Sequence, residues 1–92
     1  MDKKKVIITV VGKDTVGIIA AVCTYLAQEK INILDISQTI VDGYFNMMMI
    51  VDFDRAGLHL EDVQNSLDRI GRDMGVQIKC QKEEIFEMMH RI

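Results

Sequence analysis

The sequence predicts an α+β fold, in which a four-stranded antiparallel sheet carries two helices on one face and a short C-terminal helix follows. Two observations support this. The hydrophobic period switches between about two and about 3.6 residues, in the order strand, helix, strand, strand, helix, strand. Asp42-Gly43 separates two apolar runs by two residues, a strong signal for a hairpin. Two strand–helix–strand units with right-handed crossovers then form a ferredoxin-like βαββαβ sandwich.

The first unit covers residues 6–41. Residues 6–11 are β-branched throughout and predict a strand with both faces largely covered. A loop follows, and from about Thr15 apolar residues recur three and four apart, as in an amphipathic helix. Residues 31–41 predict the second strand, whose alternation slips by one residue at Ile33-Leu34, as it does at a β-bulge.

The second unit begins beyond the hairpin with a strand that has one continuous apolar face and one mixed face. The apolar face consists of Phe45, Met47, Met49, Val51 and Phe53. A helix after Gly57 carries one apolar stripe, and Gly71 and Gly75 near its end suit a C-cap. Residues 76–81 alternate strictly and predict a half-buried fourth strand.

The last segment, residues 83–92, predicts a short amphipathic helix. Its apolar side holds Ile85, Phe86, Met88, Met89 and Ile92, and acidic residues precede His90-Arg91, which complements a helix dipole. The mixed sheet face would otherwise expose apolar side chains to water, and the tail helix must bury its own stripe. We therefore expect the tail, a subunit interface or both to cover that face.

Length and composition limit the classes of protein. The 92 residues predict one domain, 1–92, with a core over 5–82. A hydrophobic fraction of 49% excludes disorder, and the sequence has no apolar run of about 18 residues that would span a membrane. The net charge of −3 argues against binding to nucleic acid or anionic membranes. The short apolar run after the N-terminal lysines does not make a signal peptide, so we expect a cytoplasmic protein.

Residues suited to catalysis or metal binding are sparse. Cys23 and Cys80 lie far apart at apolar positions of their own patterns, so we interpret both as buried hydrophobic residues. His59 and His90 have no nucleophile or paired carboxylate near them in sequence. No Cys, His or Asp cluster has the spacing of metal ligands. We therefore expect no catalytic residues, no metal and no cofactor, and a protein that is not an enzyme.

The segment at residues 12–19 is the most informative for function. Its two glycines have the spacing of half a phosphate loop, but Ile18-Ile19 occupies the place of the required Lys-Ser/Thr pair, which rejects a Walker A site. Two interpretations remain open. In one, Asp14 or Thr15 caps the helix and the glycines let the chain turn and the helix approach the sheet. In the other, the N–H groups at the helix N-terminus form a cradle for a carboxylate.

The motif Asp14-x-x-Gly17-Ile18-Ile19 is followed by a helix, by Ile31-Asn32-Ile33 and by a strand that ends in Gln38-Thr39. This combination resembles the ACT domain, the small regulatory module of amino-acid metabolism. The resemblance covers residues 5–82. Because the chain has no room for an appended enzyme, it is most similar to free-standing single-ACT proteins of bacteria and archaea. It is also similar, more weakly, to the ACT domains of the glycine cleavage regulator.

The resemblance implies a ligand site. In ACT domains that sense an amino acid, a loop residue and a second-strand residue grip the ligand across a subunit interface, and Asp14 and Asn32 match these two positions. Gly17 matches the glycine that lets the backbone approach the ligand. The implied ligand-binding residues are Asp14, Thr15, Val16, Gly17, Ile18 and Asn32. Val16 replaces a usual proline, and Gly12 and Asp14 replace the His and Asn of serine-sensing members. The Asp14 carboxylate suits an ammonium group and would repel a carboxylate, so serine is not implied.

Three functions remain open. The first is a homo-oligomer, most simply a dimer, that binds an amino-acid-like effector at its interface and changes how it is presented to a protein partner. The second is a ligand-free interaction adaptor that uses the same surfaces. The third, an RNA-binding or catalytic ferredoxin-like domain, is disfavoured because the sheet face offers one aromatic residue and the net charge is negative. An acylphosphatase-like site would also need an Arg where the first loop has only Lys13.

Overall fold

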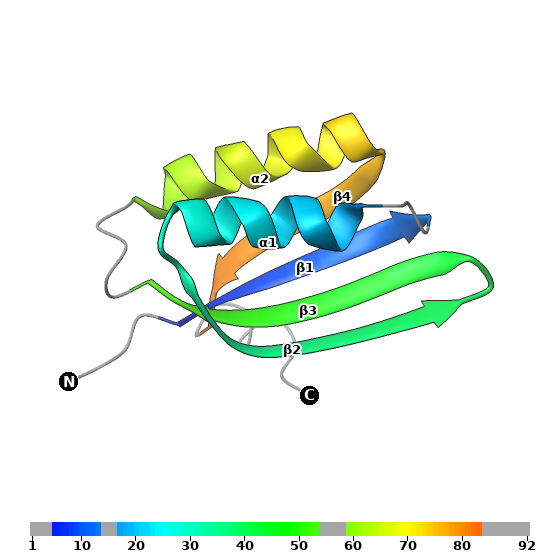
Figure 1. The fold of residues 1–92 in the computed structure, drawn as a ribbon, viewed down its shortest axis with the longest axis horizontal. Helices are drawn as coiled ribbons and strands as arrows, with labels where there is room; N and C mark the ends of the chain where they lie inside the picture. Colours follow the sequence, from blue (N-terminus) through cyan, green and yellow to red (C-terminus); the bar gives the residue numbers. More distant parts are fainter. Residues whose placement is uncertain (1–4, 14–16, 54–58, 84–92) are drawn as a thin grey trace.

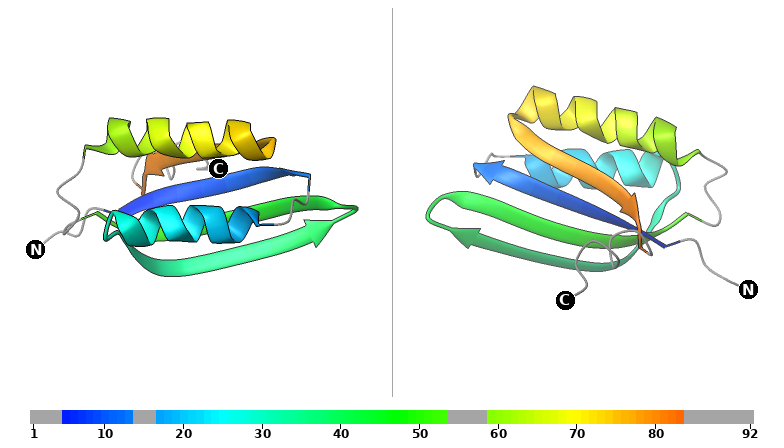
Figure 2. Two further views of the ribbon diagram at one scale, coloured as in Figure 1. Left: turned by 45° about the horizontal axis from the view of Figure 1, so that its top comes forward. Right: turned by 180° about the vertical axis from the view of Figure 1, so that it is seen from behind.

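The fold is a βαββαβ sandwich with the sheet order β2-β3-β1-β4 (Figure 1). The structure is a computed structural model and describes residues 5–13, 17–53 and 59–83. Its elements are β1 (Lys5–Lys13), α1 (Ile18–Gln28), β2 (Asn32–Val41), β3 (Tyr44–Asp52), α2 (Leu60–Met74) and β4 (Val76–Lys82). Neighbouring strands are antiparallel, and both helices lie on the same face of the sheet (Figures 1 and 2). The predicted fold class is confirmed.

The core lies between the sheet and the two helices. Alternate residues of β1, β3 and β4 are buried on this face, and α1 and α2 add the apolar residues of their inner stripes. The helix contribution comes from Ile18, Val22, Leu26, Val63 and Leu67. The predicted apolar face of β3 is buried throughout. Each fully buried aliphatic side chain of this kind contributes about 1.5–3 kcal/mol to folding.

The hairpin between β2 and β3 is confirmed. Asp42 and Gly43 have φ values of +51° and +78°, the left-handed pair that a two-residue type I′ turn requires. The predicted slip in β2 is also confirmed, as a register shift between Ile33 and Asp35 in its pairing with β3. Just after the shift, the backbone N–H of Ile36 donates to the Asp35 carboxylate at 2.8 Å.

The start of the first helix differs from the prediction. α1 begins at Ile18 instead of near Thr15, and its N-cap is Gly17 with φ +90° and no side-chain cap hydrogen bond. The N-cap position expected at Asp14 or Thr15 is therefore occupied by Gly17, where the chain enters the helix in a left-handed conformation that glycine adopts at little cost. Asp14 and Thr15 themselves lie outside the described residues.

The two glycines near the end of α2 have different roles. Gly75 is the left-handed C-cap, as predicted, and its N–H donates to the Arg72 carbonyl. Gly71 is not a cap: it lies inside the helix and is buried where α2 packs closely against the start of β4. The Gln64 side chain also joins these elements, because its Nε2 donates to the Cys80 carbonyl at 2.6 Å. Of the predicted C-terminal helix, only Glu83 is described, and it is helical; residues 84–92 lie outside the described part.

Candidate functional site

Two of the six predicted ligand residues lie at the N-terminus of α1. Gly17 is the N-cap, and Ile18 is the first helical residue, with its side chain in the core. The first turn of α1 contains no acidic side chain. Helix N-termini carry N–H groups without intrahelical partners and a partial positive charge, so a carboxylate suits this position. Asp14, Thr15 and Val16 precede it and lie outside the described residues.

Asn32, the sixth predicted residue, is the exposed first residue of β2. In the sheet register it lies opposite Asp52, which in turn pairs with Lys5 at the start of β1. An asparagine amide both donates and accepts hydrogen bonds, so it can bind either an ammonium or a carboxylate group.

Gly17 and Asn32 are far apart within one chain. Asn32 lies at the Lys5 end of the sheet, whereas Gly17 follows the other end of β1 by four residues. The eleven residues of α1 separate them, a rise of about 16 Å. Figure 1 shows the two ends of α1 over opposite ends of the sheet. The structure therefore does not bring these residues together in one subunit.

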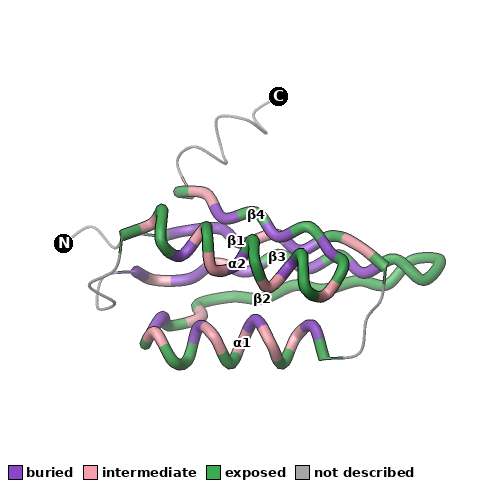
Figure 3. The backbone as a smooth tube through the Cα atoms, turned by 90° about the horizontal axis from the view of Figure 1, so that it is seen from above, coloured by how far each residue is buried: buried purple, intermediate pink, exposed green. Residues whose placement is uncertain are grey.

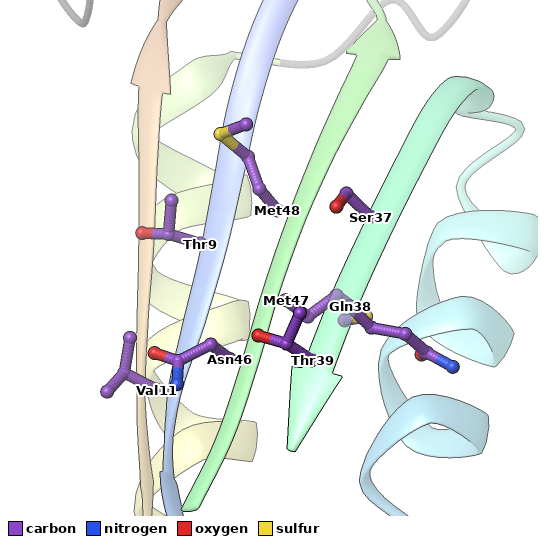
Figure 4. A pocket seen from close by; sticks show the side chains of 8 residues that line it. All are labelled: Thr9, Val11, Ser37, Gln38, Thr39, Asn46, Met47 and Met48. Carbon is purple, nitrogen blue, oxygen red and sulfur yellow. The ribbon is translucent and has the colours of Figure 1, made fainter. Parts of the chain in front are cut away.

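A shallow hollow lies on the outer face of the sheet, away from the helices (Figure 4). It has a volume of about 260 Å³ and is lined by Thr9, Val11, Ser37, Gln38, Thr39, Asn46, Met47 and Met48. Its lining combines hydroxyl and amide groups with a thioether, which suits a small polar molecule held weakly. None of these residues was among the predicted site residues. Strand alternation places Thr9, Asn46 and Met48 on one face, but it does not show that their side chains leave a hollow.

The described residues offer little reactive chemistry. Among residues 5–13, 17–53 and 59–83 no group of three His, Cys, Asp or Glu side chains could hold a metal ion. Both cysteines are free thiols; Cys80 is buried, as predicted, and Cys23 is half-buried. Burial raises the pKa of the Cys80 thiol from 9.0 to about 12, so at neutral pH it is protonated and a poor nucleophile. No helix within the described ranges is long and apolar enough to cross a membrane.

Comparison with known proteins assigns the fold to a family. The family model of the ACT domain matches residues 4–81. A UPF0237 protein of Bifidobacterium longum is 64% identical over 88 residues, which cover 96% of this chain and 98% of that one. A UPF0237 protein of the archaeon Methanocaldococcus jannaschii is 43% identical over 88 residues, with 96% of this chain and 98% of that one covered.

Comparison with solved structures gives the same assignment. An ACT domain protein from Streptococcus pneumoniae superposes with a TM-score of 0.81 at 42% identity, covering 94% of this chain and 97% of that one. A candidate glycine cleavage system transcriptional repressor superposes with a TM-score of 0.76 at 21% identity, covering 89% of this chain and 47% of that one, which shows the fold alone. The class is thus a small ACT-type βαββαβ domain. The chain belongs to the ACT-domain family and, within it, to the UPF0237 proteins.

Proposed function

We propose that this protein is a dimeric sensor that binds an amino acid or a similar small effector between its two subunits. The observation that carries the proposal is the separation of Gly17 and Asn32 by the length of α1. A small amino acid cannot span about 16 Å. A site that uses both residues must therefore take one from each of two subunits.

The edge strand β2 is the surface that would join these subunits. It is ten residues long and exposed at every position except Ile33, and most of the strand is drawn in the exposed colour in Figure 3. Beyond the bulge and Asp35, its residues 36–41 carry no charge and no Pro, whereas charged residues and Pro usually protect a sheet edge from pairing. The other edge strand, β4, carries Lys79 and Lys82. The contrast favours self-association through β2.

An antiparallel pairing of two β2 strands would also complete the site. Asn32 begins β2, and Val41 ends it at the end of the sheet where α1 starts. Two antiparallel copies would therefore bring Asn32 of one to the end of the sheet where α1 of the other begins. There the helix N–H groups suit the effector's carboxylate, Asp14 suits its ammonium group, and the Asn32 amide suits either.

The first test is a thermal melt of the protein against each of the twenty amino acids, with light scattering to give the oligomeric state. An effector at about 100 times its dissociation constant should add about 2.7 kcal/mol, a shift of several degrees for a domain of this size. Asn32→Ala should abolish the shift. Asn46→Ala is the matched control, since Asn46 is also an exposed strand asparagine but lines the outer hollow.

Each outcome is informative. A selective shift that Asn32→Ala removes and Asn46→Ala keeps supports the interface site. A shift that only Asn46→Ala removes moves the site to the outer hollow. If no amino acid shifts the melt of a well-formed dimer, the second candidate is favoured, a ligand-free adaptor. The observation in favour of that candidate is the exposed apolar surface of the β2–β3 hairpin, where Ile40 is 60% and Val41 61% exposed.

A further inference from the structure

Two residues of β1 differ in burial although they occupy equivalent positions. Ile7 and Val11 both point away from the helices, because they alternate with the core residues of the strand. Both belong to a strand that is hydrogen-bonded on each side, since β1 lies between β3 and β4. Ile7 is 5% exposed, whereas Val11 is 46% exposed.

Their sheet neighbours do not account for this difference. On β4, Ile7 is opposite Gln81 and Val11 is opposite Gln77, so the flanking side chain is the same. On β3 their partners are Ile50 and Asn46, side chains of similar size. These partners follow the same trend, because Ile50 and Gln81 are half-buried and Asn46 and Gln77 are exposed. Both helices lie on the opposite face (Figure 2). A further cover must lie over the Ile7 end of the outer face.

The chain leaves the sheet at this end. Lys82, the last residue of β4, is the register partner of Val6, and strands lie about 4.8 Å apart, so the chain departs beside Ile7. Glu83 has already left the strand and is helical. A helix over residues 83–92 would be about 15 Å long, close to three strand spacings.

The chemistry of residues 84–92 matches the covered area. Their apolar stripe offers Ile85, Phe86, Met88, Met89 and Ile92 to Ile7 and Ile50. Their acidic residues, Glu84 and Glu87, would meet Lys5 and Lys79, which lie on the outer face around Ile7. Residues 1–4 and 54–58 also adjoin this end, but three of the first four are Asp or Lys and the second segment leads to α2 on the opposite face, so neither offers an apolar stripe to the outer face.

We propose that residues 84–92 dock as an amphipathic helix on the outer face of their own sheet, over Ile7 and Ile50. The hollow around Asn46 and the exposed β2–β3 hairpin stay open. The outer face therefore has one half closed by the protein's own C-terminal segment and one half available to a ligand or partner. A second copy of the chain would then contact this one through the edge of β2.

Thiol labelling tests this proposal in the full chain. Ile7→Cys and Val11→Cys are each made in a Cys23→Ala background, in which the buried Cys80 reacts slowly. Each is then combined with Phe86→Asp/Met89→Asp, which places charges on the apolar stripe, or with Arg91→Gln, the control at a polar position that the proposed docking does not use. Maleimide labelling rates are measured on the folded protein; if the double variant does not fold, Met89→Ser replaces it.

We expect Ile7→Cys to label slowly in the parent chain and about tenfold or more faster with Phe86→Asp/Met89→Asp, because thiol reactivity follows exposure. Val11→Cys should label rapidly in all three chains, and Arg91→Gln should leave both rates unchanged. An Ile7→Cys rate that stays slow when the stripe is charged overturns the proposal, as does a parent rate as fast as that of Val11→Cys.

A monomeric variant distinguishes the protein's own sheet from that of its neighbour. Ile40→Lys at the exposed edge is expected to block pairing through β2. If the segment covers its own sheet, Ile7→Cys stays protected in this monomer. If protection disappears when the subunits separate, the cover comes from the partner and the proposal is wrong.

Discussion

The carbonyl oxygen of Val76 lies 2.7 Å from the point where a Cβ atom on Gly71 would stand. The contact joins the last turn of α2 to the first residue of β4, so it fixes how closely the helix lies on the sheet. Because the nearest atom belongs to the backbone of Val76, a clash with an added Cβ atom could not be relieved by the rotation of a flexible side chain.

Gly71→Ala should therefore destabilise the protein, although helix propensity alone predicts a gain of about 1 kcal/mol. Overpacking against backbone costs about 1–3 kcal/mol, and we expect the melting temperature to fall by several degrees. Asn65→Ala, at an exposed position of the same helix, is the control and should leave the melting temperature unchanged or slightly raised. A Gly71→Ala protein as stable as its parent would show that α2 can shift freely on β4.

Buried Cys80 gives stability a specific pH dependence. Because burial raises its pKa from 9.0 to about 12, the unfolded chain releases this proton at lower pH than the folded chain. Ionisation therefore favours unfolding above pH 9, and the contribution to stability is full below pH 9 and lost as the pH rises toward 12.

Urea titrations at about pH 8, 9.5 and 10.5 measure this effect against Cys80→Ala, which has no thiol to ionise. The free energy of unfolding of the parent should fall relative to the variant by up to about 1.4 kcal/mol per pH unit above pH 9. Parallel pH profiles for the two proteins would mean that Cys80 ionises as readily in the folded state as in the unfolded state.

The edge of β2 should be where the subunits associate. Ile40→Lys puts a charge on this edge at a side chain that is 60% exposed, so the fold should lose little stability while the dimer dissociates. Light scattering reports the mass, and circular dichroism checks the fold. Gln77→Lys, on the already lysine-bearing strand β4, is the control and should leave the mass unchanged. A dimer that persists with Ile40→Lys would place the interface elsewhere.

Local sequence was enough to predict several features because their causes are local. Asp42-Gly43 supplies the two left-handed residues that a type I′ turn needs, and the slip at Ile33-Leu34 marks the irregularity of β2 directly. Phe45 and its alternate neighbours are apolar because the sheet pleat turns each of them inward.

Other features depend on contacts that no local pattern contains. Gly71 looks like a helix terminator in sequence, and only the approach of β4 shows why the position has no side chain. The first helix begins at Ile18, directly after Gly17, because of the left-handed backbone conformation of Gly17, which residue type alone does not specify. Asn32 could be matched to a motif, but its position at the Lys5 end of the sheet, away from the start of α1, emerges only from the register of the strands.

Subunit mixing tests the interface site most directly. Asp14→Ala and Asn32→Ala should each abolish binding of the effector found in the thermal screen. In a mixed dimer of the two variants, one site carries both changes and the other carries neither. The two variants are unfolded and refolded together in equal amounts, and binding is measured by calorimetry. Random reassociation makes about half of all dimers mixed. Since one of the two sites in each mixed dimer is intact, about a quarter of all sites should bind again. No recovery in mixed dimers confirmed by mass spectrometry would contradict a site shared between subunits.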